Sequence, residues 1–130
     1  MMIAHRNGLV RIAMMCALFT GVAFTSQSQA TVLRVVVVQT EDTSAYVKEL
    51  SKAQAIGKRL GSTAVLRVWR ARFAGHDTGT VVVSIEYPSL AALAQDEAKE
   101  SADAEYSAWL KGLDKIRKIV SDSTYDELKL

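Results

Sequence analysis

Apolar residues near the start of the chain follow first the spacing of a strand and then that of a helix. Residues 32–39, VLRVVVVQ, form a run of β-branched side chains with one charge, which is typical of a strand covered on both faces. From residue 42 the apolar positions recur every three or four residues, and Asp42 or Thr43 can cap the predicted helix. Gly61 supplies a natural stop. The apolar stripe of this helix requires a sheet to pack on.

Two further strands are predicted in the middle of the chain. Residues 63–73 and 80–87 are rich in Val, Ile and aromatic side chains, a composition that favours strands. The segment between them, AGHDTG at 74–79, holds the glycines and the aspartate that tight turns require. We therefore predict a β-hairpin.

The register of this hairpin determines which side chains share a face. A six-residue turn places Phe73 opposite Thr80 and brings four polar or aromatic side chains to one face. They form two facing pairs, Arg67 with Glu86 and Trp69 with Ser84. A slip of one residue would exchange the faces of one strand.

The last third of the chain predicts two short helices and a final strand. Pro88 ends the hairpin, Ser89 is a good N-cap, a second helix is expected over 103–113, and a strand near 116–121. The order is β-α-β-β-α-β, with the second helical region divided in two. This order predicts a ferredoxin-like α+β fold with an antiparallel sheet and helices on one face.

The first thirty residues have the pattern of an export signal. A basic segment is followed by the apolar run 12–24 and then by TSQSQA, with small residues before a cleavage point after Ala30. The apolar run is shorter than the roughly 20 residues that span a bilayer. We expect a signal peptide at 1–30 and one domain at 31–130 that is periplasmic or secreted, with no stable membrane insertion after cleavage.

Removal of that segment changes the charge balance. The chain has 16 Lys and Arg against 14 Asp and Glu, and the loss of Arg6 and Arg11 leaves a neutral domain. The composition therefore gives no argument for nucleic acid as a partner. Cys16 leaves as well, so the usual Cys/His zinc sites and a Cys–His nucleophile are excluded. We expect no metal and no cofactor.

Three segments carry a resemblance to a known group of proteins. They are GTVVVSIEYPSLAALAQ at 79–95, DAEYSAWL at 103–110 and IVSDSTYDEL at 119–128. With the element order, they resemble the dimeric α+β barrel group, which includes NIPSNAP-like proteins and antibiotic biosynthesis monooxygenase-like domains. The resemblance covers most of 32–128. It implies a homodimer in which two sheets pack face to face, with a pocket between sheet and helices in each subunit.

The single histidine of the expected mature chain has two interpretations. His76 beside Asp77 suggests a general base held by a carboxylate, or a haem ligand as in some relatives of this fold. However, adjacent side chains rarely point the same way, and Gly75, Asp77 and Gly79 are the residues that a turn needs for its backbone. We favour the turn.

Five residues are candidates for a ligand site. They are Arg67, Trp69, Ser84, Glu86 and Trp109. The first four could orient a small planar ligand, with Arg67 binding a carboxylate, although an ion pair and an indole at a dimer interface explain the same cluster without chemistry. Helical spacing makes Trp109 core or pocket lining.

Three functions follow from this reading of the sequence. The first is an exported dimer that binds a small apolar or aromatic ligand without catalysis. The alternatives are a cofactor-independent monooxygenase-like enzyme, whose polar groups would have to be Arg67, Ser84 and Glu86, and a haem-associated protein that uses His76.

Overall fold

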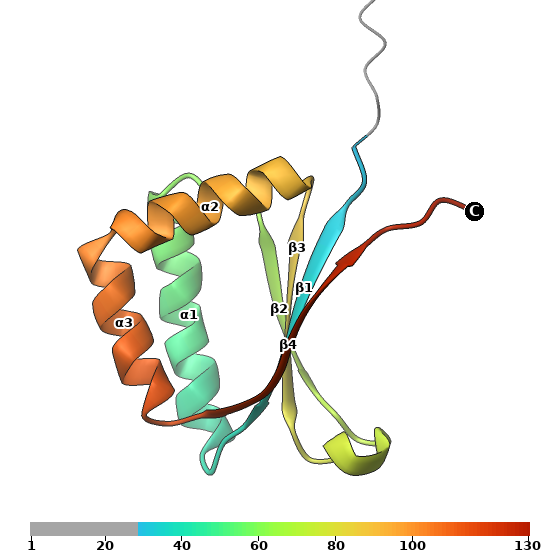
Figure 1. Cartoon of the computed structure of the whole chain (residues 1–130). Helices are drawn as coiled ribbons and strands as arrows, with labels where there is room; N and C mark the ends of the chain where they lie inside the picture. The colour runs from blue at the N-terminus through green and yellow to red at the C-terminus, as the bar shows by residue number, and fades with distance from the viewer. Residues whose placement is uncertain (1–28) are drawn as a thin grey trace, which may run out of the picture.

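A four-stranded antiparallel sheet with three helices on one face makes up the domain (Figure 1). The computed structural model describes residues 29–130, so nearly all of the expected signal peptide lies outside the described residues. The elements are β1 (Val32–Gln39), α1 (Thr43–Arg59), β2 (Val65–Arg70), a 3-10 turn (Gly75–Asp77), β3 (Val81–Tyr87), α2 (Leu90–Ala102), α3 (Ala104–Asp114) and β4 (Lys118–Asp126). None of the helices within 29–130 has the length and apolarity that a membrane span requires.

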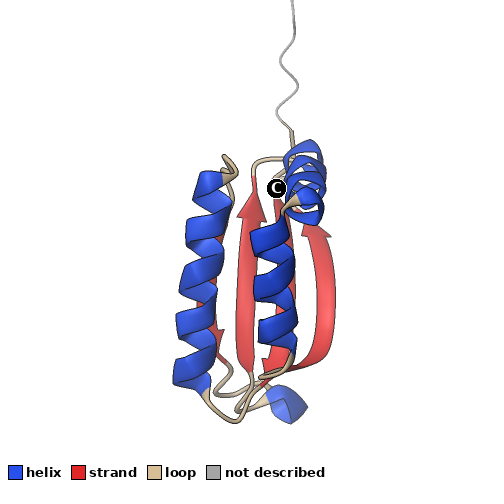
Figure 2. Ribbon diagram, turned by 90° about the vertical axis from the view of Figure 1, so that its left-hand side faces the viewer, coloured by secondary structure: helices blue, strands red, loops and turns tan. Residues whose placement is uncertain are grey.

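The strand order in the sheet is β2-β3-β1-β4, so β1 and β3 are central and β2 and β4 are edges. Strand β1 is antiparallel to both of its neighbours. The helices α1 and α3 lie side by side along the sheet, and α2 crosses one end (Figure 2). The predicted ferredoxin-like α+β architecture is confirmed.

Strand β1 has one face toward the helices and one open face. Val32, Val36 and Val38 are buried under the helices. Side chains alternate along a strand, so Leu33, Val35 and Val37 point the other way, where they are partly exposed. Within residues 29–130 only one face of this strand is covered, which leaves an apolar strip on the open face.

The local signals that start and stop the helices act as predicted. The Asp42 carboxylate accepts a 2.9 Å hydrogen bond from the backbone N–H of Ala45, and Ser89 Oγ accepts one of 3.1 Å from Ala92. Gly61 follows α1 with φ of +78°, a left-handed conformation that glycine adopts at little cost. The hydrogen bonds of Asp42 and Ser89 satisfy backbone N–H groups in the first turns of α1 and α2, so these two helices begin directly after their capping residues.

The hairpin register is wrong by two residues in the sequence-based prediction. Ala71, and not Phe73, lies opposite Thr80, with hydrogen bonds of 3.0 Å from Ala71 N to Thr80 O and 2.8 Å from Gly79 N to Ala71 O. The reason is the 3-10 turn Gly75–Asp77, which lengthens the connection and ends β2 at Arg70. A shift of two residues keeps every side chain on its predicted face.

The final strand is longer than the predicted 116–121. Strand β4 runs from Lys118 to Asp126 and pairs with β1 along its whole length, with a bulge at Val37/Val38. Backbone hydrogen bonds build this edge, and they need no apolar pattern in the side chains.

Candidate functional site

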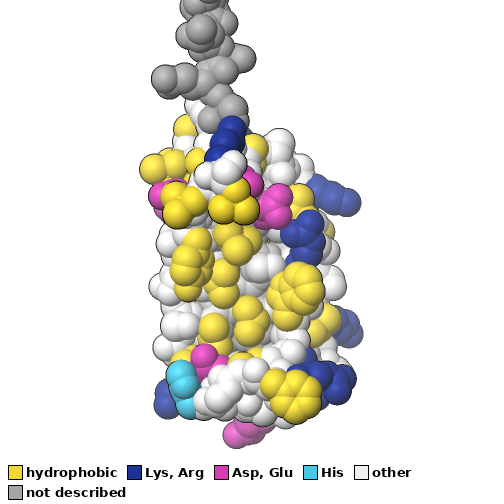
Figure 3. Space-filling view, turned by 90° about the vertical axis from the view of Figure 1, so that its right-hand side faces the viewer, with side chains coloured by type: hydrophobic (Ala, Val, Ile, Leu, Met, Phe, Trp, Pro, Cys, Tyr) yellow, Lys and Arg dark blue, Asp and Glu magenta, His cyan; other side chains and the backbone are white. Residues whose placement is uncertain are grey.

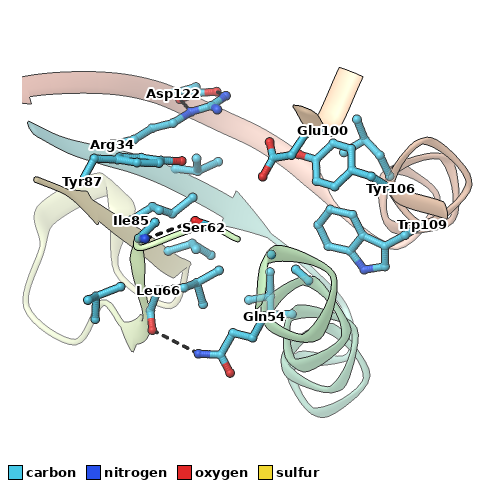
Figure 4. A pocket seen from close by; sticks show the side chains of 18 of the residues that line it. Arg34, Gln54, Ser62, Leu66, Ile85, Tyr87, Glu100, Tyr106, Trp109 and Asp122 are labelled. Atoms are coloured by element: carbon cyan, nitrogen blue, oxygen red, sulfur yellow. Dashed lines mark hydrogen bonds and ion pairs between the residues drawn. The ribbon is translucent and has the colours of Figure 1, made fainter. Parts of the chain in front are cut away.

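A pocket of about 550 Å³ lies between the sheet and the helices (Figure 4). The strands β1 and β3 form its floor, and α1 and α3 stand over it, because the helix-facing side chains of the central strands do not fill the space beneath those helices. Its apolar wall includes Val36, Leu50, Leu66, Val83, Ile85 and Trp109. We call this space the helix-side pocket.

One end of the helix-side pocket is polar. Arg34, the one charge in β1, donates two hydrogen bonds to Asp122 on β4, of 2.9 Å from Nε to Oδ1 and 2.6 Å from Nη2 to Oδ2. Its Nη1 also lies 3.6 Å from Glu97 Oε1. The guanidinium bonds hold the pKa of Asp122 below its usual value, and they raise the pKa of Arg34. The pair joins the edge strand β4 to the pocket floor.

Two tyrosines and a glutamate complete the polar end. Tyr87 is 3% exposed, and burial, with Glu100 nearby, raises its pKa to about 12. Tyr106 lies beside Glu100 (Figure 4). Burial raises the pKa of both groups, although the neighbouring Tyr106 partly offsets the effect on Glu100. The Tyr87 hydroxyl and the Glu100 carboxylate point into the pocket (Figure 4).

Trp109 forms part of the pocket wall, and its indole N–H is already engaged in a hydrogen bond. Its Nε1 donates a 2.9 Å hydrogen bond to the backbone carbonyl of Glu49 on α1. Its ring packs at 5.3 Å between centroids from Tyr106, with the planes tilted by 47°. The indole therefore offers apolar surface to a ligand and no hydrogen bond.

Tyr46, from the first turn of α1, is fully buried and also lines the pocket. Within residues 29–130 its hydroxyl has no hydrogen-bond partner. A buried hydroxyl without a partner costs free energy, so this position is an unsatisfied polar point on the pocket wall.

Comparisons with known proteins give matches to solved structures. The chain is similar to a NIPSNAP family protein from Agrobacterium tumefaciens, with a TM-score of 0.59 and 15% identity over 80% of this chain and 90% of that one. It is also similar to a conserved protein of unknown function from Bacteroides thetaiotaomicron, a possible oxidoreductase, with a TM-score of 0.56 and 8% identity over 76% of this chain and 99% of that one. The fold is NIPSNAP-like. No protein-family model and no curated protein sequence matches the chain. At these identities the likeness shows the fold alone.

Four of the five predicted ligand residues of this NIPSNAP-like domain lie on the open face of the sheet, away from the helix-side pocket. Arg67 Nη1 lies 3.1 Å from Glu86 Oε2, and Trp69 Nε1 donates a 2.8 Å hydrogen bond to Ser84 Oγ. The predicted pairs do form, but diagonally, because Arg67 stands directly opposite Ser84. Only Trp109 lines the pocket, so the five residues do not form one site.

His76 lies in the hairpin connection of the NIPSNAP-like domain and does not line the pocket. Its side chain is 90% exposed, and its Nε2 is 3.1 Å from Asp77 Oδ1. Gly75 and Gly79 have φ of +58° and +93°, as the turn interpretation requires. Among residues 29–130, no three His, Cys, Asp or Glu side chains are grouped to hold a metal ion.

Sequence reasoning missed the polar end of the pocket in this NIPSNAP-like fold. Its members Arg34, Tyr87, Glu100, Tyr106 and Asp122 come from five elements. One signal was available, because a single arginine within a β-branched run must find a partner if its face is buried. The partner, Asp122, is 88 positions away, so spacing could not identify it.

Proposed function

We propose that this protein binds a small apolar or aromatic ligand in the helix-side pocket. The observation that carries the proposal is a space of about 550 Å³ with an aliphatic and aromatic wall, into which the Tyr87 hydroxyl and the Glu100 carboxylate project. Small-molecule sites combine such a wall with a few convergent polar groups that fix the ligand's orientation.

Two observations make binding the favoured function over the alternatives. The monooxygenase-like reading required Arg67, Ser84 and Glu86 in the pocket, and these side chains lie on the other face of the sheet. The haem reading required His76, whose imidazole is in an exposed turn outside the pocket. Neither arrangement supports chemistry at the pocket, whereas a binding site needs only the wall and the polar end.

Export and dimerisation belong to the same proposal. The N-terminal basic, apolar and small-residue pattern supports cleavage near Ala30 and a periplasmic or secreted protein. The open face of the sheet carries apolar side chains over several strands (Figure 3), among them Val65 and Trp69, which is 54% exposed. A second copy of the chain is the proposed partner, because an apolar sheet face on a neutral domain fits its own copy.

Two measurements on the purified protein test the ligand proposal. Native mass spectrometry detects a bound small molecule, and titration with a neutral solvatochromic dye, Nile red, measures binding to the pocket. The variant Ala53→Leu places a larger side chain in the pocket wall, and Ala55→Leu makes the same change at an exposed position of α1 outside the pocket. Dye binding should weaken at least about tenfold in Ala53→Leu and stay unchanged in Ala55→Leu. Equal binding by both variants and the parent protein would place the dye elsewhere and reject the proposal.

A further inference from the structure

Carboxylates surround Arg34 at the polar end of the helix-side pocket. Arg34 is bound by Asp122 in a two-bond pair and has Glu97 at 3.6 Å, so two carboxylates already offset its charge. Asp96 and Glu100 add two more, both from α2, and their proximity to Tyr87 is one reason that this phenol resists ionisation. Lys58 and Arg117 also line the pocket, so the preference for positive charge is local to the space beside Glu100 and Tyr87.

Glu100 has capacity for another hydrogen bond. A carboxylate accepts about four hydrogen bonds, and Tyr106 is the neighbouring side chain that favours the ionised form of Glu100. The other acid of α2, Asp96, is buried and is already bonded by the Ser62 hydroxyl. Glu100 is thus the carboxylate that faces the pocket with acceptor positions left, and its partner should be a donor.

The Tyr87 hydroxyl is an independent indication that a ligand group belongs here. Its side chain is almost completely buried, and its hydroxyl points into the pocket (Figure 4). A ligand group placed between Tyr87 and Glu100 would contact both polar side chains.

Aromatic rings surround the same end of the pocket. Tyr87 lies on the floor, and Tyr106 and Trp109 pack together on α3 above it (Figure 4). The negative faces of such rings attract organic cations, and the attraction is larger where water is excluded. The aromatic rings and the Glu100 carboxylate therefore both favour a positively charged ligand group.

We propose that the ligand is an organic amine in its ammonium form, with its nitrogen between Glu100 and Tyr87 and an apolar or aromatic body along Ile85, Leu66 and Leu50. The inference rests on the proposed ligand-binding function and specifies its chemical class. A carboxylate ligand at this point is disfavoured because it would lie against the Glu100 carboxylate, and Arg34 is already paired with Asp122.

The test compares three molecules of similar shape that differ in their polar group. Isothermal titration calorimetry measures binding of 2-phenylethylamine, 2-phenylethanol and 3-phenylpropionate at neutral pH. The amine should bind about tenfold more tightly than the alcohol, and the acid most weakly, since charge selects among them. Glu100→Gln should remove the advantage of the amine over the alcohol. Glu41→Gln, an exposed position outside the pocket, should leave all three affinities unchanged.

The outcomes separate this inference from the proposal on which it rests. Alcohol or acid binding as tight as amine binding, with displacement of Nile red, would overturn the amine assignment and keep the binding function. An amine preference that survives Glu100→Gln would also overturn the assignment, because a group other than Glu100 would then bind the ammonium. Failure of all three molecules and of Nile red to bind would overturn both.

Discussion

The indole nitrogen of Trp109 donates a 2.9 Å hydrogen bond to the backbone carbonyl of Glu49 and so joins α3 to α1, the two helices that cover the helix-side pocket. The contact matters because the pocket lies beneath these two helices, so its shape depends on their position relative to each other. Trp109 is thus a structural part of the pocket as well as part of its wall.

Replacing Trp109 by Phe tests this tie. The variant keeps an aromatic ring beside Tyr106 but cannot donate to Glu49, so the free energy of unfolding should fall by about 1–2 kcal/mol from the lost bond and lost packing. Urea unfolding followed by circular dichroism measures the change. Lys111→Arg, an exposed change on the same helix, is the control, and a Trp109→Phe variant as stable as the parent protein would contradict the prediction.

Tyr46 gives the opposite expectation. Its buried hydroxyl has no partner within residues 29–130, so Tyr46→Phe should raise the free energy of unfolding by about 1 kcal/mol. The measurement is thermal and urea unfolding of the ligand-free protein. Lower stability would mean that the hydroxyl is bonded in solution and that the wall is less apolar at this point than the structure indicates.

Glu100 should make the fold less stable at neutral pH than its amide would. Its pKa is raised in the fold, mainly by burial, so ionisation above the unfolded pKa of about 4.3 works against folding. Glu100→Gln should therefore raise stability at pH 7, by less than about 1 kcal/mol because the side chain is partly exposed. Below about pH 4, where both states of the parent protein are protonated, the advantage should disappear. A gain that persists unchanged at low pH would contradict this cause.

Asp122 should show the reverse dependence on pH. Its pKa is lowered by the Arg34 hydrogen bonds, so its stabilising effect is complete above the unfolded pKa of about 3.9 and is lost as the pH falls through the folded pKa. Asp122→Asn should cost about 1 kcal/mol at pH 7, since the side chain is 34% exposed and solvent screens the pair. Unfolding between pH 7 and pH 2 should show a smaller decline for Asp122→Asn than for the parent protein. Asp126→Asn, an exposed change on the same strand, should keep the parent's full decline.

A change on the open face of the sheet tests the proposed dimer. Trp69→Glu places a charge where a second copy would pack, and should shift the protein from dimer to monomer in light scattering coupled to gel filtration. Arg72→Glu, in the exposed hairpin connection, introduces the same charge away from the proposed contact. A parent protein that is already a monomer at micromolar concentration would remove the basis of the dimer proposal.

The sequence predicted those parts of the fold whose signals are local. The β-branched run gave the bounds of β1, and Asp42, Ser89 and Gly61 marked helix ends because each acts on backbone groups within a few residues. The hairpin register failed because turn composition identifies a turn without its length, and the 3-10 segment took up two residues. Strand β4 was underestimated because its pairing depends on the backbone of β1, which no side-chain pattern in β4 reveals.

The candidate site was less accessible to prediction than the fold. Arg67, Trp69, Ser84 and Glu86 were found because they are close in a hairpin, and they do lie together on the open face. The residues of the polar end come together only when the sheet and the two helices α2 and α3 assemble, and Arg34 and Asp122 are 88 positions apart. The β-branched run around Arg34 indicates only that this arginine needs a partner, and nothing near Asp122 in the sequence marks it as that partner.

Strand β3 has a consequence for how this protein can change during evolution. Its alternate side chains serve two surfaces, with Val83, Ile85 and Tyr87 toward the pocket and Val82, Ser84 and Glu86 toward the open face. A point substitution in the strand alters one surface and spares the other, so ligand preference and self-association can diverge separately. An insertion or deletion of one residue would exchange the two sets at once, which makes this short strand tolerant of replacement and intolerant of any change in length.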